Sequence, residues 1–236
     1  MTPTPSNQTG PTILLIATSR GLGLAMAEEF LKKSWNVVGT VRAGSGRTKL
    51  HDLADHFQGR LEIETLDICE QYQVEALRQR LSGRVFDMLF VNAGIGIHDN
   101  IVDVTTDEFI RIMLTNALCP MRVVESLQGL VSENGLIGVM SSGQGSIANN
   151  VNGMHELYRG SKSALNQFMR SYAARNSGSP RAMVLMAPGW VRTELGGPDA
   201  RLSIEESVPN LVNVLLKKQG NPGLEYLDYL GRTVPW

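Results

Sequence analysis

Cysteine is scarce in this sequence, and its scarcity excludes one class of protein. Only Cys69 and Cys119 occur among 236 residues, too few for the disulfide framework of a small secreted domain. Long apolar runs are also missing, since no stretch approaches the 18 residues of a membrane-spanning helix. The opening MTPTPSNQTGP is polar and contains proline, unlike a signal peptide. We therefore expect a flexible tail over residues 1–11 and a cytoplasmic protein that does not bind membranes.

An excess of charge of one sign is absent as well. The net charge is −1 and the isoelectric point is near 6.4, so there is no global attraction for nucleic acid. No His and Cys cluster has the spacing of metal ligands, and we expect no metal site. Neither GxxxxGK[ST] nor GxSxG occurs, which excludes P-loop NTPases and α/β-hydrolases.

What the chain does contain is an alternation of short apolar runs and segments with helical periodicity. The expected strands are residues 12–17, 36–41, 61–66, 86–91, 136–141, 182–187 and 224–229. The expected helices are residues 21–33, 47–57, 70–81, 106–131, 156–175 and 203–218, and Thr105 with Glu108 predicts a capping box before the fourth of them. This pattern is typical of an α/β fold, a Rossmann-type doubly wound sandwich whose seven-stranded, mostly parallel sheet has helices on both faces. We expect one domain over residues 12–236.

The stretch IATSRGLG, residues 16–23, lies between the first expected strand and the first expected helix. Gly21 and Gly23 permit a tight turn, and the helix N-terminus offers N–H groups and a positive dipole end to an anion. Arg20 opposes that dipole by roughly a few tenths of a kcal/mol, which favours a phosphate between them. A plain strand–helix turn would explain the two glycines equally well.

A basic loop follows the second expected strand. Dinucleotide-binding folds place an acidic residue about 20 residues past the glycine turn to bind the ribose 2′-hydroxyl, or an arginine to accept a 2′-phosphate. Here no acidic residue occurs from Phe30 to His51, and Arg42 takes the place of one. Arg20 and Arg42 can converge on one phosphate, although a solvated basic loop is the alternative. The pattern favours NADP(H) over NAD(H).

Two further strand ends carry weaker signals. Asp67, in LDI, is placed to accept a hydrogen bond from an adenine amino group, and VNAG, residues 91–94, is a small-residue turn that can pass close to a ribose. A capping aspartate and an ordinary turn explain these two features as well.

The strongest signal follows the fifth expected strand, where Ser142 is followed by Tyr158 and Lys162 at i,i+4 spacing on one helix face. A phenol has an ordinary pKa near 10 and exchanges protons poorly at pH 7. A neighbouring ammonium stabilises the phenolate and lowers that pKa. Ser142 can hold the carbonyl oxygen that the phenol protonates. A chance Tyr-x-x-x-Lys is common, but its place at this strand end favours catalysis.

Together these residues resemble the short-chain dehydrogenase/reductase family over about residues 12–236. The order of parts is similar: glycine turn, LDI, NAG, a mid-helix asparagine, serine, YxxxK and PGWVRT. PGWVRTELGGPDA, residues 188–200, and the ending GRTVPW resemble the C-factor/sniffer-like branch of carbonyl reductases. The resemblance implies that Tyr158 is the catalytic acid/base and that Lys162 lowers its pKa and binds the nicotinamide ribose. It also implies that Ser142 orients the carbonyl and that Asn116 holds a water in a proton relay.

The resemblance also implies a cofactor site and a substrate site. The cofactor residues would be Ala17, Ser19, Arg20, Gly21, Leu22, Gly23, Arg42, Asp67, Ile68, Asn92, Ala93, Gly94, Tyr158, Lys162, Pro188, Gly189, Val191 and Thr193. The substrate residues would be Gly143, Gln144, His155 and Trp190, although a residue placed like His155 is more often a cap or loop residue. Ala17 replaces the first glycine of the family pattern, and we expect it to weaken cofactor binding rather than abolish it.

We therefore expect an NADPH-dependent oxidoreductase that reduces a ketone or aldehyde to an alcohol, with an open pocket and an apolar carbonyl substrate. The alternative is an NAD(P)-binding signalling or cofactor-sensing protein of C-factor type with little turnover. The intact Asn116, Ser142, Tyr158 and Lys162 favour the enzyme. By resemblance we also expect a homodimer or homotetramer that pairs through the helices at 106–131 and 156–175, the first of them kinked at Pro120.

Overall fold

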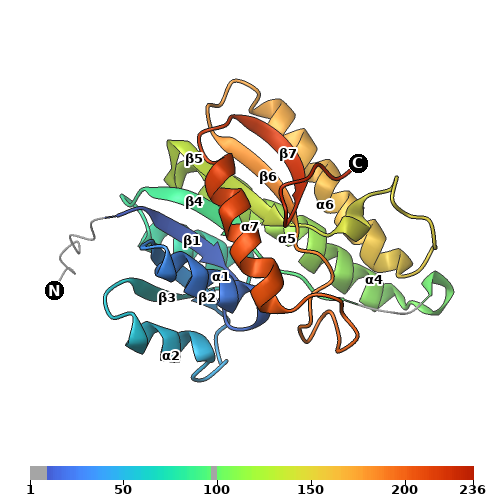
Figure 1. Ribbon diagram of the computed structural model, residues 1–236, viewed down its shortest axis with the longest axis horizontal. Coiled ribbons are helices and arrows are strands. Elements are labelled where there is room, and N and C mark those ends of the chain that lie inside the picture. Colours follow the sequence, from blue (N-terminus) through green and yellow to red (C-terminus); the bar gives the residue numbers. More distant parts are fainter. Residues whose placement is uncertain (1–9, 97–99) are drawn as a thin grey trace.

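Seven parallel strands form the central sheet of the protein (Figure 1). The computed structural model describes residues 10–96 and 100–236. The strands are β1 (Thr12–Ile16), β2 (Asn36–Val41), β3 (Leu61–Thr65), β4 (Phe86–Val91), β5 (Val131–Met140), β6 (Ala182–Ala187) and β7 (Gly223–Asp228). Their order is β3-β2-β1-β4-β5-β6-β7, and every neighbouring pair is parallel. The chain therefore reverses its direction across the sheet between β1 and β4, and the expected Rossmann-type fold is confirmed.

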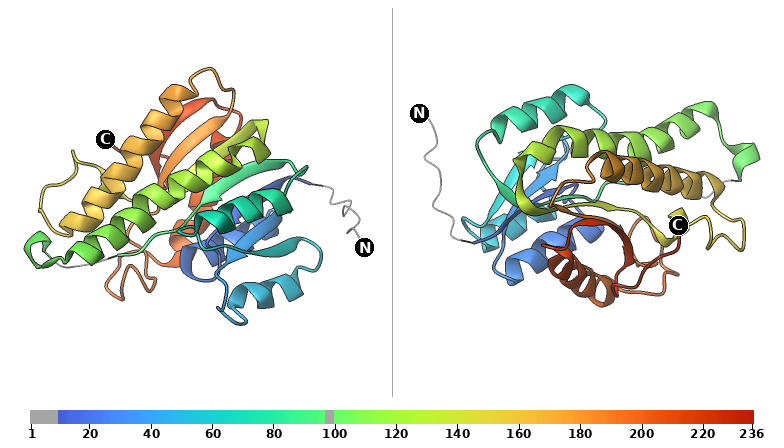
Figure 2. Two further views of the ribbon diagram at one scale, coloured as in Figure 1. Left: turned by 180° about the vertical axis from the view of Figure 1, so that it is seen from behind. Right: turned by 90° about the horizontal axis from the view of Figure 1, so that it is seen from above.

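Helices cover both faces of the sheet because its strands are apolar on both sides. Along β1, Leu14 and Ile16 face one buried cluster, whereas Ile13 and Leu15 face the other. The first cluster is completed by α3 (Gln71–Arg80), α5 (Cys119–Leu127) and α6 (Glu156–Arg175). The second is completed by α1 (Gly21–Lys32), α2 (Lys49–His56) and α7 (Ile204–Lys218). Figure 2 shows the first group on the face opposite to that seen in Figure 1.

The expected helix over residues 106–131 is in fact divided into parts. It consists of α4 (Thr106–Met113), a π-helical turn η2 (Leu114–Leu118) and α5, and the chain then passes through the short 3₁₀ segment η3 (Gln128–Leu130) into β5. Pro120 has no amide hydrogen to donate to the preceding turn, and the wider π turn lies directly before it. The expected capping box is confirmed, since the Glu108 amide donates to Thr105 Oγ1 at 3.2 Å.

Strand β5 begins at Val131, five residues before the position expected from the sequence. Residues 132–134 of this strand are intermediate or exposed, and its continuous buried run starts only at residue 135. Two further 3₁₀ segments, η1 (Ile101–Asp103) and η4 (Gly143–Gly145), lie in the loops after β4 and β5. Most of the expected N-terminal tail, residues 1–9, lies outside the described residues.

Within the part of the chain that the structure describes, no helix is both long and apolar enough to cross a membrane. The same residues contain no group of three or more His, Cys, Asp or Glu side chains that could hold a metal ion.

Candidate active site

The carboxyl ends of the central strands bring the expected catalytic residues together. Ser142 follows β5, Tyr158 and Lys162 lie in the first two turns of α6, and Asn116 lies in the π turn η2. The hydroxyl of Ser142 accepts the Gln144 amide at 3.1 Å, and it lies close enough to the Tyr158 phenol to lower the pKa of that phenol. The two groups expected to hold and protonate a carbonyl oxygen are therefore neighbours at this strand end.

The pKa of Tyr158 is raised above its ordinary value, chiefly because the phenol is withdrawn from water. The neighbouring Ser142 hydroxyl lowers the pKa of Tyr158 and partly offsets burial, whereas Tyr226 raises this pKa further. Lys162 is not among the groups that shift the pKa of Tyr158 here, so its expected role in lowering that pKa stays a prediction. The Lys162 ammonium is directed elsewhere.

Lys162 is buried and donates from Nζ to the carbonyl oxygen of Met140 at 3.0 Å. No carboxylate among residues 10–96 and 100–236 forms an ion pair with it. Burial alone lowers the pKa of Lys162 to about 8, because the charged form is poorly solvated in the interior. The cation is thus held beside the site by a neutral carbonyl group.

Asn116 joins the π turn to the loop after β4. Its fully buried side chain accepts the Ile95 amide at 2.8 Å, and donates to the Ile95 carbonyl at 2.8 Å and to Ser161 Oγ at 3.0 Å. A Cβ atom at Gly94 would lie 3.2 Å from Lys162 Nζ and 3.5 Å from Asn116 Oδ1. These contacts fix the turn at Gly94 against two of the expected catalytic residues.

The glycine turn after β1 is closely packed. Ala17 lies in the left-handed region at φ 67°, and its amide donates to Thr40 Oγ1 at 2.9 Å. A Cβ atom at Gly23 would lie 2.1 Å from the carbonyl oxygen of Ala17, so only glycine fits there. Helix α1 starts at Gly21 with neither a side-chain cap nor an acidic residue in its first turn. Its first N–H groups therefore point to a place suited to an anion.

Arg20 and Arg42, the two expected phosphate ligands, differ in their surroundings. Arg20 forms an ion pair with Glu194 at 2.7 Å, between two largely exposed side chains. Arg42 is exposed after β2, and no carboxylate in the described part of the chain pairs with it. Arg42 thus remains available to a ligand, whereas Arg20 is engaged by the loop after β6.

The adenine and ribose parts of the expected cofactor site lie after β3 and β4. Asp67 Oδ1 accepts the Cys69 amide at 2.9 Å, and Ile68 is buried beneath it. Asn92 donates from Nδ2 to the Ala17 carbonyl at 3.2 Å, next to the buried Ala93. Its Oδ1 atom is buried and has no hydrogen-bond partner within the described residues. An unpaired buried acceptor is suited to a donor supplied by a ligand, such as a ribose hydroxyl.

The loop between β6 and α7 packs against two other loops of the site. It starts at Pro188 and Gly189 (φ 83°), and Val191 is buried. The segment Thr193–Leu195, here called the strap, reaches both earlier loops. A Cβ atom at Gly21 would lie 3.9 Å from Thr193 Cγ2, and one at Gly96 would lie 2.5 Å from Leu195 Cδ1. The strap thus spans from the glycine turn to the loop after β4.

The expected substrate residues lie on the loops that follow β5 and β6. Gly143 and Gln144 form the short η4 turn directly after Ser142, and His155 precedes α6 in a left-handed conformation. Trp190 is 52% exposed, and its Nε1 donates to the Gly196 carbonyl at 2.7 Å. Its indole therefore supports its own loop and leaves half of its surface exposed.

Sequence reasoning missed a polar layer behind Ser142. Ser141 Oγ donates to Asn166 Oδ1 at 2.6 Å, Asn166 Nδ2 donates to the Gly145 carbonyl at 3.1 Å, and Tyr226 donates its hydroxyl to the Ser142 carbonyl. Asn166 could have been found, because it continues the i,i+4 row of Tyr158 and Lys162. Tyr226 carried no local signal, since it lies on β7.

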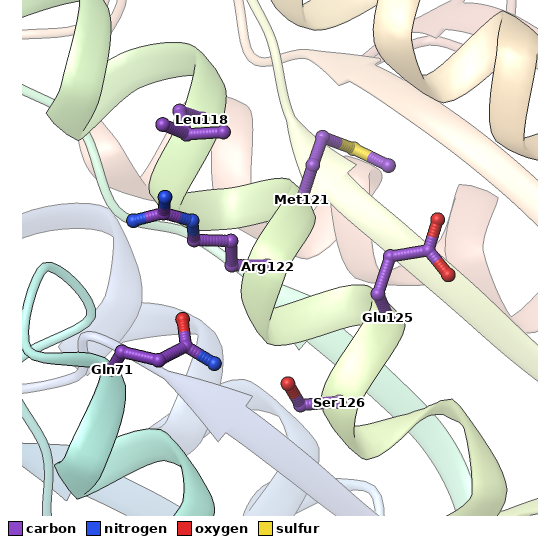
Figure 3. Close-up of a pocket in the computed structure, with 6 residues that line it drawn as sticks. All are labelled: Gln71, Leu118, Met121, Arg122, Glu125 and Ser126. Atoms are coloured by element: carbon purple, nitrogen blue, oxygen red, sulfur yellow. The ribbon is translucent and has the colours of Figure 1, made fainter.

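The structure also has an open pocket of about 460 Å³ that contains none of the expected site residues (Figure 3). It lies between α3 and the outer side of α5, and it is lined by Gln71, Leu118, Met121, Arg122, Glu125 and Ser126.

Comparison with known proteins agrees with this geometry. Residues 16–210 match the family described as enoyl-(acyl carrier protein) reductase. A Burkholderia multivorans protein assigned to the short-chain dehydrogenases/reductases, solved with bound NADP, is 67% identical with a TM-score of 0.95, over 96% of this chain and 100% of that chain. A carbonyl reductase from Pseudomonas aeruginosa PAO1 in complex with NADP is 34% identical with a TM-score of 0.89, over 97% and 100% of the two chains. C-signal from Myxococcus xanthus is 35% identical over 153 residues, which are 64% of this chain and 92% of that protein.

Proposed function

The chain belongs to the short-chain dehydrogenase/reductase family, and on this premise we propose that it is an NADPH-dependent carbonyl reductase. The observation that carries the proposal is the placement of Ser142 next to the Tyr158 phenol, on the helix that also carries the buried Lys162. The reaction would convert a ketone or aldehyde into an alcohol.

The cofactor residues present fit a dinucleotide phosphate. The close turn at Gly23, the open N-terminus of α1 and the unpaired Oδ1 of Asn92 are suited to a pyrophosphate and its ribose. Arg42, with Arg20, would bind the 2′-phosphate. When bound, NADPH supplies the hydride that reduces the carbonyl carbon.

The protein side chains would move and hold the proton. Ser142 Oγ would hold the substrate oxygen against the Tyr158 phenol. A phenol with an ordinary pKa near 10 is already protonated at neutral pH, and burial raises the pKa of Tyr158 further in that direction. Tyr158 would donate that proton to the oxygen as the alcohol forms. Lys162 would bind the ribose hydroxyls, and Asn116 would hold the turn at Gly94 in place, beside the proton relay that the resemblance implies.

An apolar carbonyl compound is the proposed substrate class. The loops after β5 and β6 expose Ile147, Val151, Met154 and Trp190, each by more than half of its surface. Apolar side chains around an open site favour apolar ligands and provide few groups that would select one polar substrate.

The test combines binding and turnover. The purified protein would be titrated with NADPH and NADH by fluorescence, and then assayed against a panel of ketones and aldehydes. We expect tighter binding of NADPH, and we expect Tyr158→Phe to lower turnover by about 10²–10⁴-fold with little change in NADPH affinity. Turnover by this variant close to that of the wild type would contradict the proposed role of Tyr158.

A cofactor-sensing protein with little turnover is the second candidate function. Similarity to C-signal and the left-handed Ala17 in the glycine turn favour it. Saturable NADPH binding without turnover of any carbonyl in the panel would support this function over the reductase.

We further propose a cytoplasmic homodimer or homotetramer that pairs through α4, α5 and α6. Phe109, Leu114 and Phe168 are each more than one-third exposed on α4, η2 and α6, and α4 and α6 pack side by side. The pocket on α5 adds Leu118 and Met121 to this side of the molecule (Figure 3). Large apolar side chains at the surface are typical of protein interfaces.

A further inference from the structure

Tyr226, on the edge strand β7, contacts the backbone of Ser142. Only 1% of its surface is exposed, and its hydroxyl donates to the Ser142 carbonyl oxygen. The Gly145 amide donates to the same oxygen at 2.8 Å. A carbonyl oxygen has two lone pairs, and both are therefore used at Ser142.

The C-terminal segment supports this contact. The ring centroids of Trp236 and Tyr226 lie 5.5 Å apart. The guanidinium of Arg170 lies over the Trp236 ring, 4.8 Å from its centroid. The backbone oxygen of Trp236 accepts the Ala148 amide at 3.0 Å and Ser146 Oγ at 3.3 Å. The loop that starts at Ser142 is thus held at two points by residues from the end of the chain.

We propose that Tyr226 is a positioning residue for Ser142, supported by Trp236. It acts through the Ser142 backbone and does not contact the reacting atoms. The inference rests on the proposed function, because it assigns Tyr226 to the reaction in which Ser142 holds the substrate oxygen. Small displacements of an orienting group cost large factors in rate, so losing this contact is expected to affect turnover before cofactor binding.

The chain offers a matched control in Tyr172. This tyrosine is also 1% exposed, and its hydroxyl donates to Gln128 Oε1 at 2.7 Å, a contact that involves none of the proposed site residues. Tyr226→Phe and Tyr172→Phe therefore each remove one hydrogen-bonding hydroxyl from a buried ring. Any general effect of that loss on folding should be similar in the two variants.

The experiment measures kcat, KM for a carbonyl substrate and Kd for NADPH in the wild type and both variants. It also measures backbone amide exchange over residues 142–148 by mass spectrometry. For Tyr226→Phe we expect kcat to fall tenfold or more, Kd for NADPH to stay within twofold, and exchange over 142–148 to be faster. Tyr172→Phe should match the wild type in all of these.

Two results would overturn the proposal: kcat of Tyr226→Phe within twofold of the wild type, or equal losses in the two variants. If the wild type binds NADPH but reduces no carbonyl, the proposed function fails. The amide exchange measurement then tests by itself whether Tyr226 positions the loop at Ser142. Faster exchange only in Tyr226→Phe would then support positioning of the loop, and unchanged exchange would overturn it.

Discussion

At the scale of single residues, Lys162 is buried at a cost to stability. Its pKa is about 8 in the folded protein, against 10.5 in an exposed lysine. Between these values the unfolded chain binds more protons, so stability rises with pH. The penalty is fully present below about pH 8 and disappears above about pH 10.5, and by linkage it is about 3 kcal/mol. A group retained at this cost is typical of a functional site.

Replacing Lys162 with methionine should therefore stabilise the protein while removing its activity. We expect Lys162→Met to raise the free energy of unfolding at pH 7 by about 1–3 kcal/mol. This range lies at or below the full penalty because the hydrogen bond to the Met140 carbonyl is also lost. The gain should shrink as pH rises from 8 to 10.5. Urea unfolding at several pH values measures this, with the exposed Lys217→Met as control. A less stable Lys162→Met at pH 7 would show that burial of this cation is not destabilising.

Ala17 is the second residue at which local conformation matters. A non-glycine residue in the left-handed region costs about 1–2 kcal/mol, and Ala17 lies there at φ 67°. Its amide and carbonyl are both hydrogen-bonded, to Thr40 and Asn92, so the surrounding contacts maintain the conformation. The turn thus keeps a glycine-like shape without the glycine, which is the physical reason to retain it as a phosphate-binding candidate.

At the scale of elements, the strap links the glycine turn after β1 and the loop after β4, which are far apart in the sequence. Glu194 in the strap forms an ion pair with Arg20 in the glycine turn, although Arg20 was expected to bind a phosphate. A carboxylate here competes for that arginine and repels the anionic cofactor.

Glu194→Gln should consequently bind NADPH more tightly. Exposed ion pairs contribute at most about 1 kcal/mol, so we expect Kd to fall roughly two- to fivefold, with a smaller effect at high salt. Fluorescence titration at low and high salt measures this. Glu28→Gln, which breaks the exposed pair with Lys32 on α1, serves as control and should leave Kd unchanged. Weaker NADPH binding by Glu194→Gln would instead mean that Glu194 helps to hold the strap closed.

The π turn shows why an element boundary could not be read from the sequence. Helical periodicity continues from residue 106 to beyond Pro120, and it predicted one kinked helix. The structure replaces the kink with η2, and the wider turn carries Asn116. The side-chain amide of Asn116 then forms hydrogen bonds with the backbone of Ile95, in the loop after β4. Periodicity records which face of a helix is buried, but it does not record a local change of helical register.

At the scale of the whole molecule, the exposed apolar side chains on α4 and α6 predict self-association. We expect analytical ultracentrifugation to show a dimer or tetramer, and Phe168→Arg to shift the protein toward the monomer, because burying an unpaired charge in an interface is unfavourable. Val85→Arg, at an exposed apolar residue directly before β4 rather than on α4 or α6, should leave the assembly unchanged. A monomeric wild type would contradict the proposed interface.

The sequence by itself determined the order of strands and helices and the spacing of Tyr158 and Lys162, because periodicity and i,i+4 neighbours are local properties of the chain. It also predicted the family, since the short motifs occur in a fixed order. Only the tertiary structure decided that Glu194 engages Arg20, that burial sets the pKa of Tyr158, and that Tyr226 holds Ser142, 84 residues away. Such contacts and burial arise when distant segments pack together, and no local pattern encodes them.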